Sequence, residues 1–417
     1  MPQFRLAPLS LVLAAALTPI ALAEKAPESQ PTGDQPEAVE TKAVETEAKG
    51  ESQPEQSKPA QKPRVELAIL LDTSGSMTGL INQARTHLWS IVNEFESIKR
   101  NGQRPDVYVA LYEYGNSRLD EKTGWVRQIV PLTGDLDTIS EKLFALTTSG
   151  GSEFCGQVIQ SAVTELEWST GPGVLRTVFI AGNEPFTQGP VDFRKACAAA
   201  ADLGITVSTI HCGAEQTGID TMWAEGAKLA DGSYFHIEQN AVERPINAPQ
   251  DTRIAELNAE LNQTYIPYGN ATERSRALGR QSAQDANALK LAPAAIAQRA
   301  FTKSSANYRN SHWDLVDAVR LKKVKLEAVP AEQLPEALRS MTLDQRREHV
   351  AAQQSRREAI QKEIQQLSAA RAKHVAEVRR ERVASGEAPA SPMLGKAVGE
   401  AVREQAVASG FEVRPSR

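Results

Sequence analysis

Hydrophobic positions between residues 65 and 237 follow two alternating patterns, and together they predict an α/β fold. Short, nearly continuous apolar runs typical of strands buried in a sheet occupy residues 65–72, 106–114, 126–131, 174–181, 205–211 and 233–237. Between these runs apolar residues recur with the helical period, as in residues 80–98 and 154–168. Strands separated by helices of this length predict a Rossmann-like, mostly parallel sheet flanked by helices. An antiparallel arrangement stays open for the strands between residues 106 and 131.

The second half of the chain has a helical pattern with few apolar positions. Residues 240–342 are expected to form a helical region that packs on or next to the α/β domain, through the aromatic segment 307–319. Residues 343–417 are expected to form a long helix and a weakly ordered tail. Ile360, Ile364 and Leu367 have heptad spacing, so this helix forms either a short, partial coiled coil or a layer folded back on a neighbouring helix.

The first residues have the order of a secretory signal peptide. Arg5 precedes an apolar stretch that ends in Ala21-Leu22-Ala23, which predicts cleavage after residue 23. A transmembrane anchor is the alternative, but Pro8 and Pro19 interrupt a short apolar run. Residues 24–62 lack aromatic side chains and are expected to be a disordered linker, either a spacer or a tail without a role of its own. We therefore expect a periplasmic or secreted protein.

Charge and cysteine content exclude some partners and leave others open. The 417 residues carry a formal net charge of −5, which gives no reason to expect nucleic acid as a partner. Arg379, Arg380 and Arg382 are either a solvated helical face or a contact for an anionic membrane or wall polymer, which nothing else in the sequence indicates. The three cysteines allow at most one intramolecular disulfide, and Cys197 and Cys212 are the nearest pair in sequence.

The clearest candidate site follows the first strand. Asp72, Ser74 and Ser76 form the pattern D-x-S-x-S at the expected carboxyl end of a central strand, where open α/β sheets bind ligands. All three side chains offer oxygen, the donor that Mg²⁺ and Ca²⁺ prefer. The alternative is a turn in which these side chains cap the following helix.

With its apolar lead-in, this stretch resembles the first signature of a von Willebrand factor A (VWA) domain, and the resemblance covers residues 64–239. The phrases GNEPFTQGP and TIHCG, with the helical second half, are similar to exported bacterial VWA proteins. The resemblance implies a VWA domain at residues 63–239, with D-x-S-x-S as its metal-ion-dependent adhesion site.

The same resemblance implies two further ligand loops. Ser152 stands where the family usually has Thr, and it serves either as a ligand or as a helix N-cap. Gly182 stands where the family's third-loop Asp belongs, so one carboxylate is missing, and replacing Gly182 by Asp is expected to strengthen metal binding. Three additional ligand candidates are Thr148, Asn183 and Glu184.

These observations predict a binding protein. We expect an exported protein-interaction module that holds Mg²⁺ weakly, with a dissociation constant on the order of millimolar, Ca²⁺ and Mn²⁺ being alternatives. An unidentified protein partner would supply an acidic side chain to the ion. The alternative is a structural envelope scaffold with a vestigial metal site. No enzyme is expected and no catalytic residue is assigned, because the adjacent His211 and Cys212 should face opposite sides of their strand.

Overall fold

The computed structural model describes residues 62–238, 240, 246–387 and 393–413. The expected signal peptide, residues 1–23, lies outside these ranges. Of the expected linker, residues 24–62, only Lys62 is described. No helix in the described ranges is both long and apolar enough to cross a membrane.

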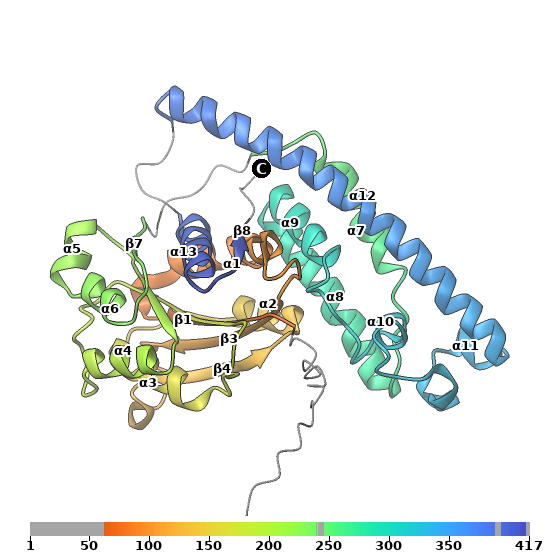
Figure 1. The fold of residues 1–417 in the computed structure, drawn as a ribbon, viewed down its shortest axis with the longest axis horizontal. Helices are drawn as coiled ribbons and strands as arrows, with labels where there is room; N and C mark the ends of the chain where they lie inside the picture. The colour runs from red at the N-terminus through yellow and green to blue at the C-terminus, as the bar shows by residue number, and fades with distance from the viewer. Residues whose placement is uncertain (1–61, 239, 241–245, 388–392, 414–417) are drawn as a thin grey trace, which may run out of the picture. The chain divides into compact units, whose positions relative to one another are not determined.

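A six-stranded sheet forms the first half of the described chain (Figure 1). Its strands are β1 (Arg64–Asp72), β3 (Asp106–Tyr114), β4 (Val126–Thr133), β5 (Val174–Gly182), β6 (Thr206–His211) and β7 (Tyr234–His236). They lie in the order β4-β3-β1-β5-β6-β7, and every neighbouring pair is parallel except β3 and β4. The predicted mostly parallel sheet is confirmed, and its edge pair is antiparallel.

Helices cover both faces of the sheet, as Figure 1 shows. One face packs against α1 (Thr78–Glu94) and α2 (Leu136–Ala145), and the other against α3 (Cys155–Glu165), α4 (Phe193–Asp202) and α6 (Trp223–Leu229). The residues of β1 alternate between the two cores, with Leu67 and Leu71 on the α1 side and Leu70 on the α3 side. Helices therefore cover both faces of β1, which explains why its sequence is apolar at almost every position.

The segment between β6 and β7 forms two short helices. These are α5 (Glu215–Asp220) and α6, and Met222 stands between them with φ = +73°. A left-handed residue cannot continue a right-handed helix, so the chain must turn there.

The sheet is completed by the far end of the chain. Helix α13 (Leu394–Ala408) packs beside α1 on the same face, and it buries Leu394, Val398 and Val402 in the sheet core. After α13, β8 (Glu412–Val413) pairs with β2 (Ile98–Lys99). The sequence predicted a weakly ordered tail here. An isolated helix of this length is only marginally stable, and its partner surface cannot be identified from local sequence. Residues 62–238 together with α13 and β8 are here called the sheet domain.

Residues 246–387, here called the helical region, lie in sequence between β7 and α13. Its helices are α7 (Asp251–Asn262), α8 (Ala271–Leu291), α9 (Pro293–Lys303), α10 (Leu315–Arg320), α11 (Glu336–Arg339) and α12 (Leu343–Ala384). Helices α8 and α9 are separated at Ala292, which is extended with φ = −171°. Proline disfavours a helical residue before it, so α8 ends and α9 begins at this point.

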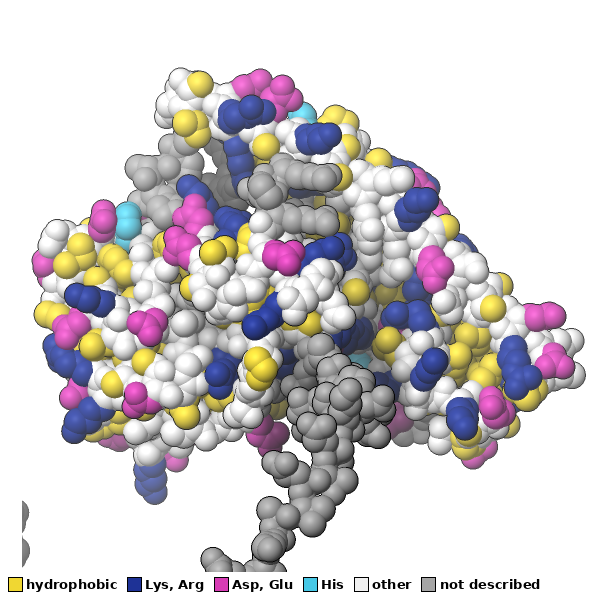
Figure 2. Space-filling view, in the orientation of Figure 1, with side chains coloured by type: hydrophobic (Ala, Val, Ile, Leu, Met, Phe, Trp, Pro, Cys, Tyr) yellow, Lys and Arg dark blue, Asp and Glu magenta, His cyan; other side chains and the backbone are white. Residues whose placement is uncertain are grey.

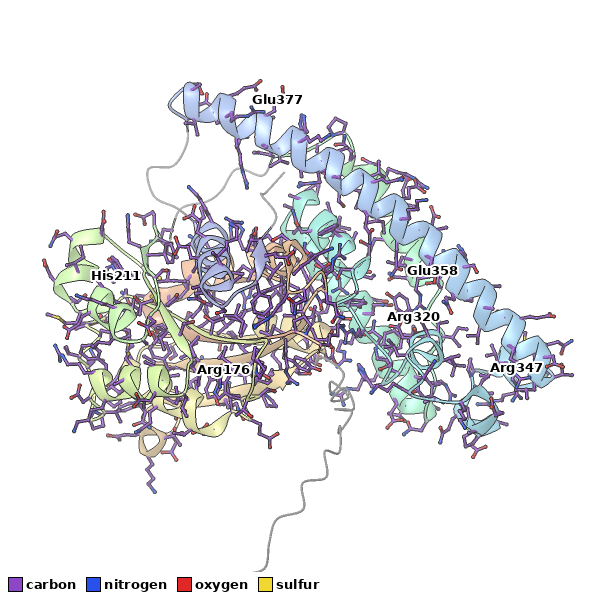
Figure 3. All side chains as sticks on the ribbon, in the orientation of Figure 1. Arg176, His211, Arg320, Arg347, Glu358 and Glu377 are labelled. Carbon is purple, nitrogen blue, oxygen red and sulfur yellow. The ribbon has the colours of Figure 1, made fainter. Side chains whose placement is uncertain are left out.

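The long helix α12 is folded back on its neighbours. Ile360 and Ile364 are buried against residues of α7 and α9. Of the two arrangements that the sequence left open, this is the helix folded back on a neighbouring helix and not the coiled coil. Arg347, Glu358 and Glu377 mark successive points along α12 in Figure 3. Figure 2 shows Lys and Arg interspersed with Asp and Glu along the visible side of this helix, which is typical of a solvated face.

The aromatic segment, residues 307–319, contacts the sheet domain as expected, but through polar atoms: Tyr308 donates to Asp137 Oδ2 and Asn307 to Glu96 Oε1, each at 2.7 Å. Trp313 is buried in a cluster with Tyr265, Tyr308 and Ile360, all from the helical region. The contact with the sheet domain is mainly polar instead: Asn93 of α1 donates to Gln298, Ser140 of α2 to Gln284, and Arg299 to Asp137. A polar interface carries no apolar periodicity, so the sequence could not point to it.

Candidate functional site

The D-x-S-x-S loop leaves the carboxyl end of β1, at the centre of the sheet. Asp72 is the last residue of β1 and is fully buried. The Ser74 N–H donates to Asp72 Oδ1 at 2.7 Å, and the hydroxyls of Ser74 and Ser76 are 3.3 Å apart. No side-chain hydrogen bond caps the following 3-10 turn (Gly75–Met77) or α1. The loop therefore groups its oxygen atoms without using them as helix caps.

A second loop, residues 147–154, lies against the first. The Ser149 N–H donates to the Thr73 carbonyl at 3.0 Å, and Asn116 Nδ2 donates to both the Thr147 and the Thr73 carbonyls, at 2.8 and 3.3 Å. Asn116 follows β3, so residues after two strands hold this loop in place. These bonds bring the Gly-Gly-Ser-Glu sequence, residues 150–153, next to β1.

The acidic residue of the second loop, Glu153, lies beside Asp72. Its side chain is 6% exposed, and its N–H donates to Gln188 Oε1 at 2.8 Å. A Cβ atom built on Gly115 would lie 2.7 Å from Glu153 Cγ and 2.9 Å from Asp72 Oδ1. Gly115 also has φ = +79°, which glycine alone tolerates well. The absence of a side chain at Gly115 therefore lets the two carboxyl groups approach each other.

The two carboxyl groups shift each other's pKa in opposite directions. Burial, the largest effect, raises the pKa of Asp72 to about 6, although hydrogen bonds with Ser74 and Glu153 act in the opposite direction. Burial and the neighbouring Asp72 raise the pKa of Glu153 to about 9, and the charge of Glu184 raises both pKa values further. In the described residues, Asp72 Oδ2 and Glu153 Oε2 have no hydrogen-bond partner.

The third loop follows β5 and begins at Gly182. A Cβ atom there would lie 3.2 Å from Asp72 Oδ2 but only 2.4 Å from the hydroxyl of Tyr114, which donates to the Ala181 carbonyl at 3.1 Å. The tyrosine therefore occupies the space that a side chain at position 182 would need. Gly182 is not among the residues with positive φ, so this close approach, not backbone conformation, accounts for the glycine.

The other candidate ligands differ in whether they contact the D-x-S-x-S loop. Asn183 Oδ1 accepts from Ser76 Oγ at 3.4 Å, so Asn183 adjoins the serine hydroxyls. Thr148 Oγ1 lies 3.0 Å from Thr78 Oγ1, at an exposed margin. Among the described residues no hydrogen bond joins Ser152 to the first loop, and Ser152 does not cap α3. Glu184 influences Asp72 through its charge, and its carbonyl accepts from Trp223 Nε1 at 2.9 Å.

Sequence reasoning missed Glu153 and Tyr114. The signal for Glu153 was an acidic residue directly after Gly-Gly-Ser in the second loop. For Tyr114 the only signal was its place at the end of β3. Its distance from Gly182 depends on the tertiary structure, because their strands are separated by β1.

The donor set fits a hard divalent cation in part. It consists of two buried carboxylates, one of them carrying an unpartnered oxygen aimed toward position 182, and two serine hydroxyls. Oxygen ligands of this kind suit Mg²⁺, Ca²⁺ or Mn²⁺. Within the described ranges, however, no three His, Cys, Asp or Glu residues are grouped as a metal site. Any cation here therefore depends on hydroxyl ligands as well as carboxylates.

The neighbouring histidine and cysteine do not form a catalytic pair. His211, labelled in Figure 3, packs on Trp223, while Cys212 belongs to the core on the opposite face of the sheet. Burial lowers the pKa of His211 and raises that of Cys212. All three cysteines are buried free thiols, and Cys197 lies on the other face of the sheet from Cys212. Closeness in sequence was therefore a poor guide to pairing.

Comparisons with known proteins agree with this fold. The family model for the von Willebrand factor type A domain matches residues 66–234. Similar solved structures include BatB from Bacteroides thetaiotaomicron, with 20% identity over 42% of this chain and 90% of that chain and a TM-score of 0.32. An aerotolerance-related membrane protein from Bacteroides fragilis shows 17% identity over 42% of this chain and 93% of that chain, with a TM-score of 0.30.

A third similar structure is proximal thread matrix protein 1 from the mussel byssus, solved with zinc in its adhesion-site motif. It has 11% identity over 43% of each chain and a TM-score of 0.34. No curated protein matched the sequence.

Proposed function

Residues 66–234 are a von Willebrand factor type A domain, and from this we propose that the chain is a protein-interaction module whose partner docks at the carboxyl edge of the sheet. A divalent cation, Mg²⁺ in the first instance, would be held there by Asp72, Ser74 and Ser76. The observation that carries the proposal is Asp72 Oδ2, a fully buried carboxylate oxygen that has no hydrogen-bond donor among the described residues. Leaving such an atom unpaired is costly, and a cation would remove that cost.

The role of the cation would be to bridge the two proteins. Asp72 and the hydroxyls of Ser74 and Ser76 would hold it, and an oxygen of the partner would complete its coordination. The sequence favours an acidic side chain from the partner, because a site with few charged protein ligands leaves positive charge to be neutralised. We propose no catalytic role, since the site contains no activated nucleophile.

Export is part of the proposal. Residues 1–23 have the order of a signal peptide, and a mature chain beginning near Glu24 would be periplasmic or secreted. N-terminal sequencing of the protein recovered from outside the cytoplasm should start at or near Glu24. A soluble mature protein that retains Met1 would contradict export.

A structural scaffold with a vestigial site is the second candidate. Tyr114 fills the space beside Gly182, which excludes a side-chain ligand at position 182, and this observation favours the scaffold. The two candidates differ in whether the site binds metal at all.

Calorimetric titration of Mg²⁺ and Mn²⁺ into the full chain distinguishes them. Wild type should bind one ion, Asp72→Ala should lose this binding, and Asp202→Ala, which removes an exposed carboxylate at the end of α4, should keep it. Partner capture by wild type should fall when EDTA is added. If wild type and Asp72→Ala give the same heat on metal addition, and EDTA does not change partner capture, the scaffold is favoured.

A further inference from the structure

We propose that Glu153 is a direct ligand of the cation at this site, supplying from the second loop the second negative charge that position 182 does not supply. This inference rests on the proposed function, because it assigns a further ligand to the same cation. It goes beyond the family resemblance, which implies a hydroxyl ligand from the second loop.

The first argument is position. Glu153 Cγ and Asp72 Oδ1 both come within 3 Å of one point, the position of a Cβ atom on Gly115. Glu153 and Asp72 are 6% and 0% exposed, and Asp72 Oδ2 and Glu153 Oε2 each lack a hydrogen-bond partner in the described part of the chain. Two buried carboxylates with unused oxygens form a site that a divalent ion would stabilise.

The second argument is the exclusion of the alternative position. A Cβ atom on Gly182 would face Asp72 Oδ2 at 3.2 Å, so an acidic residue there could share an ion with Asp72. The Tyr114 hydroxyl, 2.4 Å from that same Cβ position, leaves no room for it. Glu153 approaches Asp72 beside Gly115, where the backbone leaves space. The anionic ligand has therefore moved from the third loop to the second.

The third argument is how firmly Glu153 is held. Its N–H donates to Gln188 Oε1, and the preceding loop is bound to β1 and β3 through Ser149 and Asn116. A ligand on an anchored loop loses little conformational freedom when it binds an ion. The carboxylate thus faces Asp72 before any ion arrives.

Two carboxylates change the kind of partner that the site requires. Asp72 and Glu153 together offset the double positive charge of the ion, so the partner need not bring a third anion. A neutral oxygen, such as a backbone carbonyl or a side-chain amide, then suffices to complete the coordination. The ion should also bind more tightly without a partner than a site with Asp72 alone would allow.

The competing explanation is that Glu153 is a protonated acid that only donates a hydrogen bond to Asp72. Glu153→Gln separates the two explanations, because an amide N–H can still donate to Asp72 but carries no negative charge. Under the competing explanation, Glu153→Gln preserves the local structure and leaves metal affinity unchanged or raises it. Under our proposal, metal affinity falls.

The test is Mn²⁺ binding to the full chain, measured by calorimetry and by the electron paramagnetic resonance signal of free Mn²⁺. Competition by Mg²⁺ gives the affinity for that ion. We expect Glu153→Gln to weaken binding at least about tenfold and Glu184→Gln, which removes a charge acting on the site from the third loop, to weaken it clearly less. Asp202→Asn, which changes an exposed carboxylate at the end of α4, is the control and should leave binding unchanged. Thermal unfolding without metal should show that Glu153→Gln is folded and at least as stable as wild type, since the amide is neutral and can still donate a hydrogen bond to Asp72.

Each result has a distinct meaning. If Glu153→Gln binds Mn²⁺ as wild type does while Asp72→Ala does not, the proposed function stands and Glu153 is not a ligand. If wild type binds no ion, the proposed function and this inference both fail. If Glu184→Gln weakens binding as much as Glu153→Gln, the effect comes from total charge, and direct ligation by Glu153 is overturned.

Discussion

Arg299 of α9 and Asp137 of α2 form a buried ion pair that joins the helical region to the sheet domain. Arg299 Nη1 lies 2.7 Å from Asp137 Oδ1, and the two side chains are 0% and 2% exposed. Tyr308 donates to the other oxygen of Asp137 at 2.7 Å, and the Arg299 guanidinium lies 4.6 Å from the centre of the Trp89 ring. Tyr308 and Trp89 are thus buried with the pair.

Breaking this pair should destabilise the protein strongly. Removing one partner of a buried ion pair leaves an uncompensated charge, and the usual loss is about 3–5 kcal/mol in the free energy of unfolding. We expect a loss of this size for Arg299→Ala, measured by urea unfolding. Arg253→Ala, which breaks exposed ion pairs with Glu260 of α7 and Glu363 of α12, is the control and should change stability little. Equal effects of the two variants would contradict a special role for Arg299.

The same cluster should make stability depend on pH in acid. Burial by itself would raise the pKa of Asp285, but the charges of Lys303 and Arg299 outweigh burial and hold that pKa below its ordinary value. A carboxyl group with a lowered pKa in the folded state contributes stability that is present above its unfolded pKa, near 3.9, and lost as the pH falls below it.

The variant Asp285→Asn tests this direction of the pH dependence of stability. Wild type should lose free energy of unfolding between about pH 5 and pH 3, and Asp285→Asn, although less stable at pH 7, should lose less over the same interval. Urea unfolding at several pH values gives both slopes. Parallel slopes would show that other carboxylates govern the acid response.

The sheet domain should require α13. Val402 is fully buried in the sheet core, whereas Val407 on the same helix is 61% exposed. At about 0.8 kcal/mol per buried CH₂ plus a term for the cavity, Val402→Ala should cost about 2 kcal/mol, and Val407→Ala close to nothing. A chain ending at residue 387 should expose apolar surface and aggregate or lose cooperative unfolding. A cooperative, soluble truncated chain would contradict this role for α13.

Position 182 should accept a carboxylate only after Tyr114 is changed. Gly182→Asp alone should be destabilising, contrary to the expectation from sequence, because its Cβ would lie 2.4 Å from the Tyr114 hydroxyl. Tyr114→Phe removes this oxygen and costs about 1 kcal/mol for the lost bond to Ala181. The double variant should bind Mg²⁺ more tightly than Tyr114→Phe, its control, in a calorimetric titration. Equal affinities would mean that position 182 does not face the ion.

Much of the sheet and part of the site could be predicted from local sequence. The apolar run of β1 has to be buried on both faces wherever it lies, and Asp72, Ser74 and Ser76 are close in space because they are close in sequence. Helix α9 begins at Pro293 because proline fixes its own backbone and restricts the residue before it. These features depend on neighbours along the chain.

The remaining features depend on residues that are distant in sequence. Glu153 meets Asp72, and Tyr114 fills the space at Gly182, only because β3, β1 and β5 lie side by side with their ends aligned. Helix α13 has an apolar face whose partner, α1, is about 300 residues earlier, and the Arg299–Asp137 pair spans 162 positions. Local propensity and periodicity show that a face must be buried or a charge paired, but only the tertiary structure decides which distant surface or charge does so.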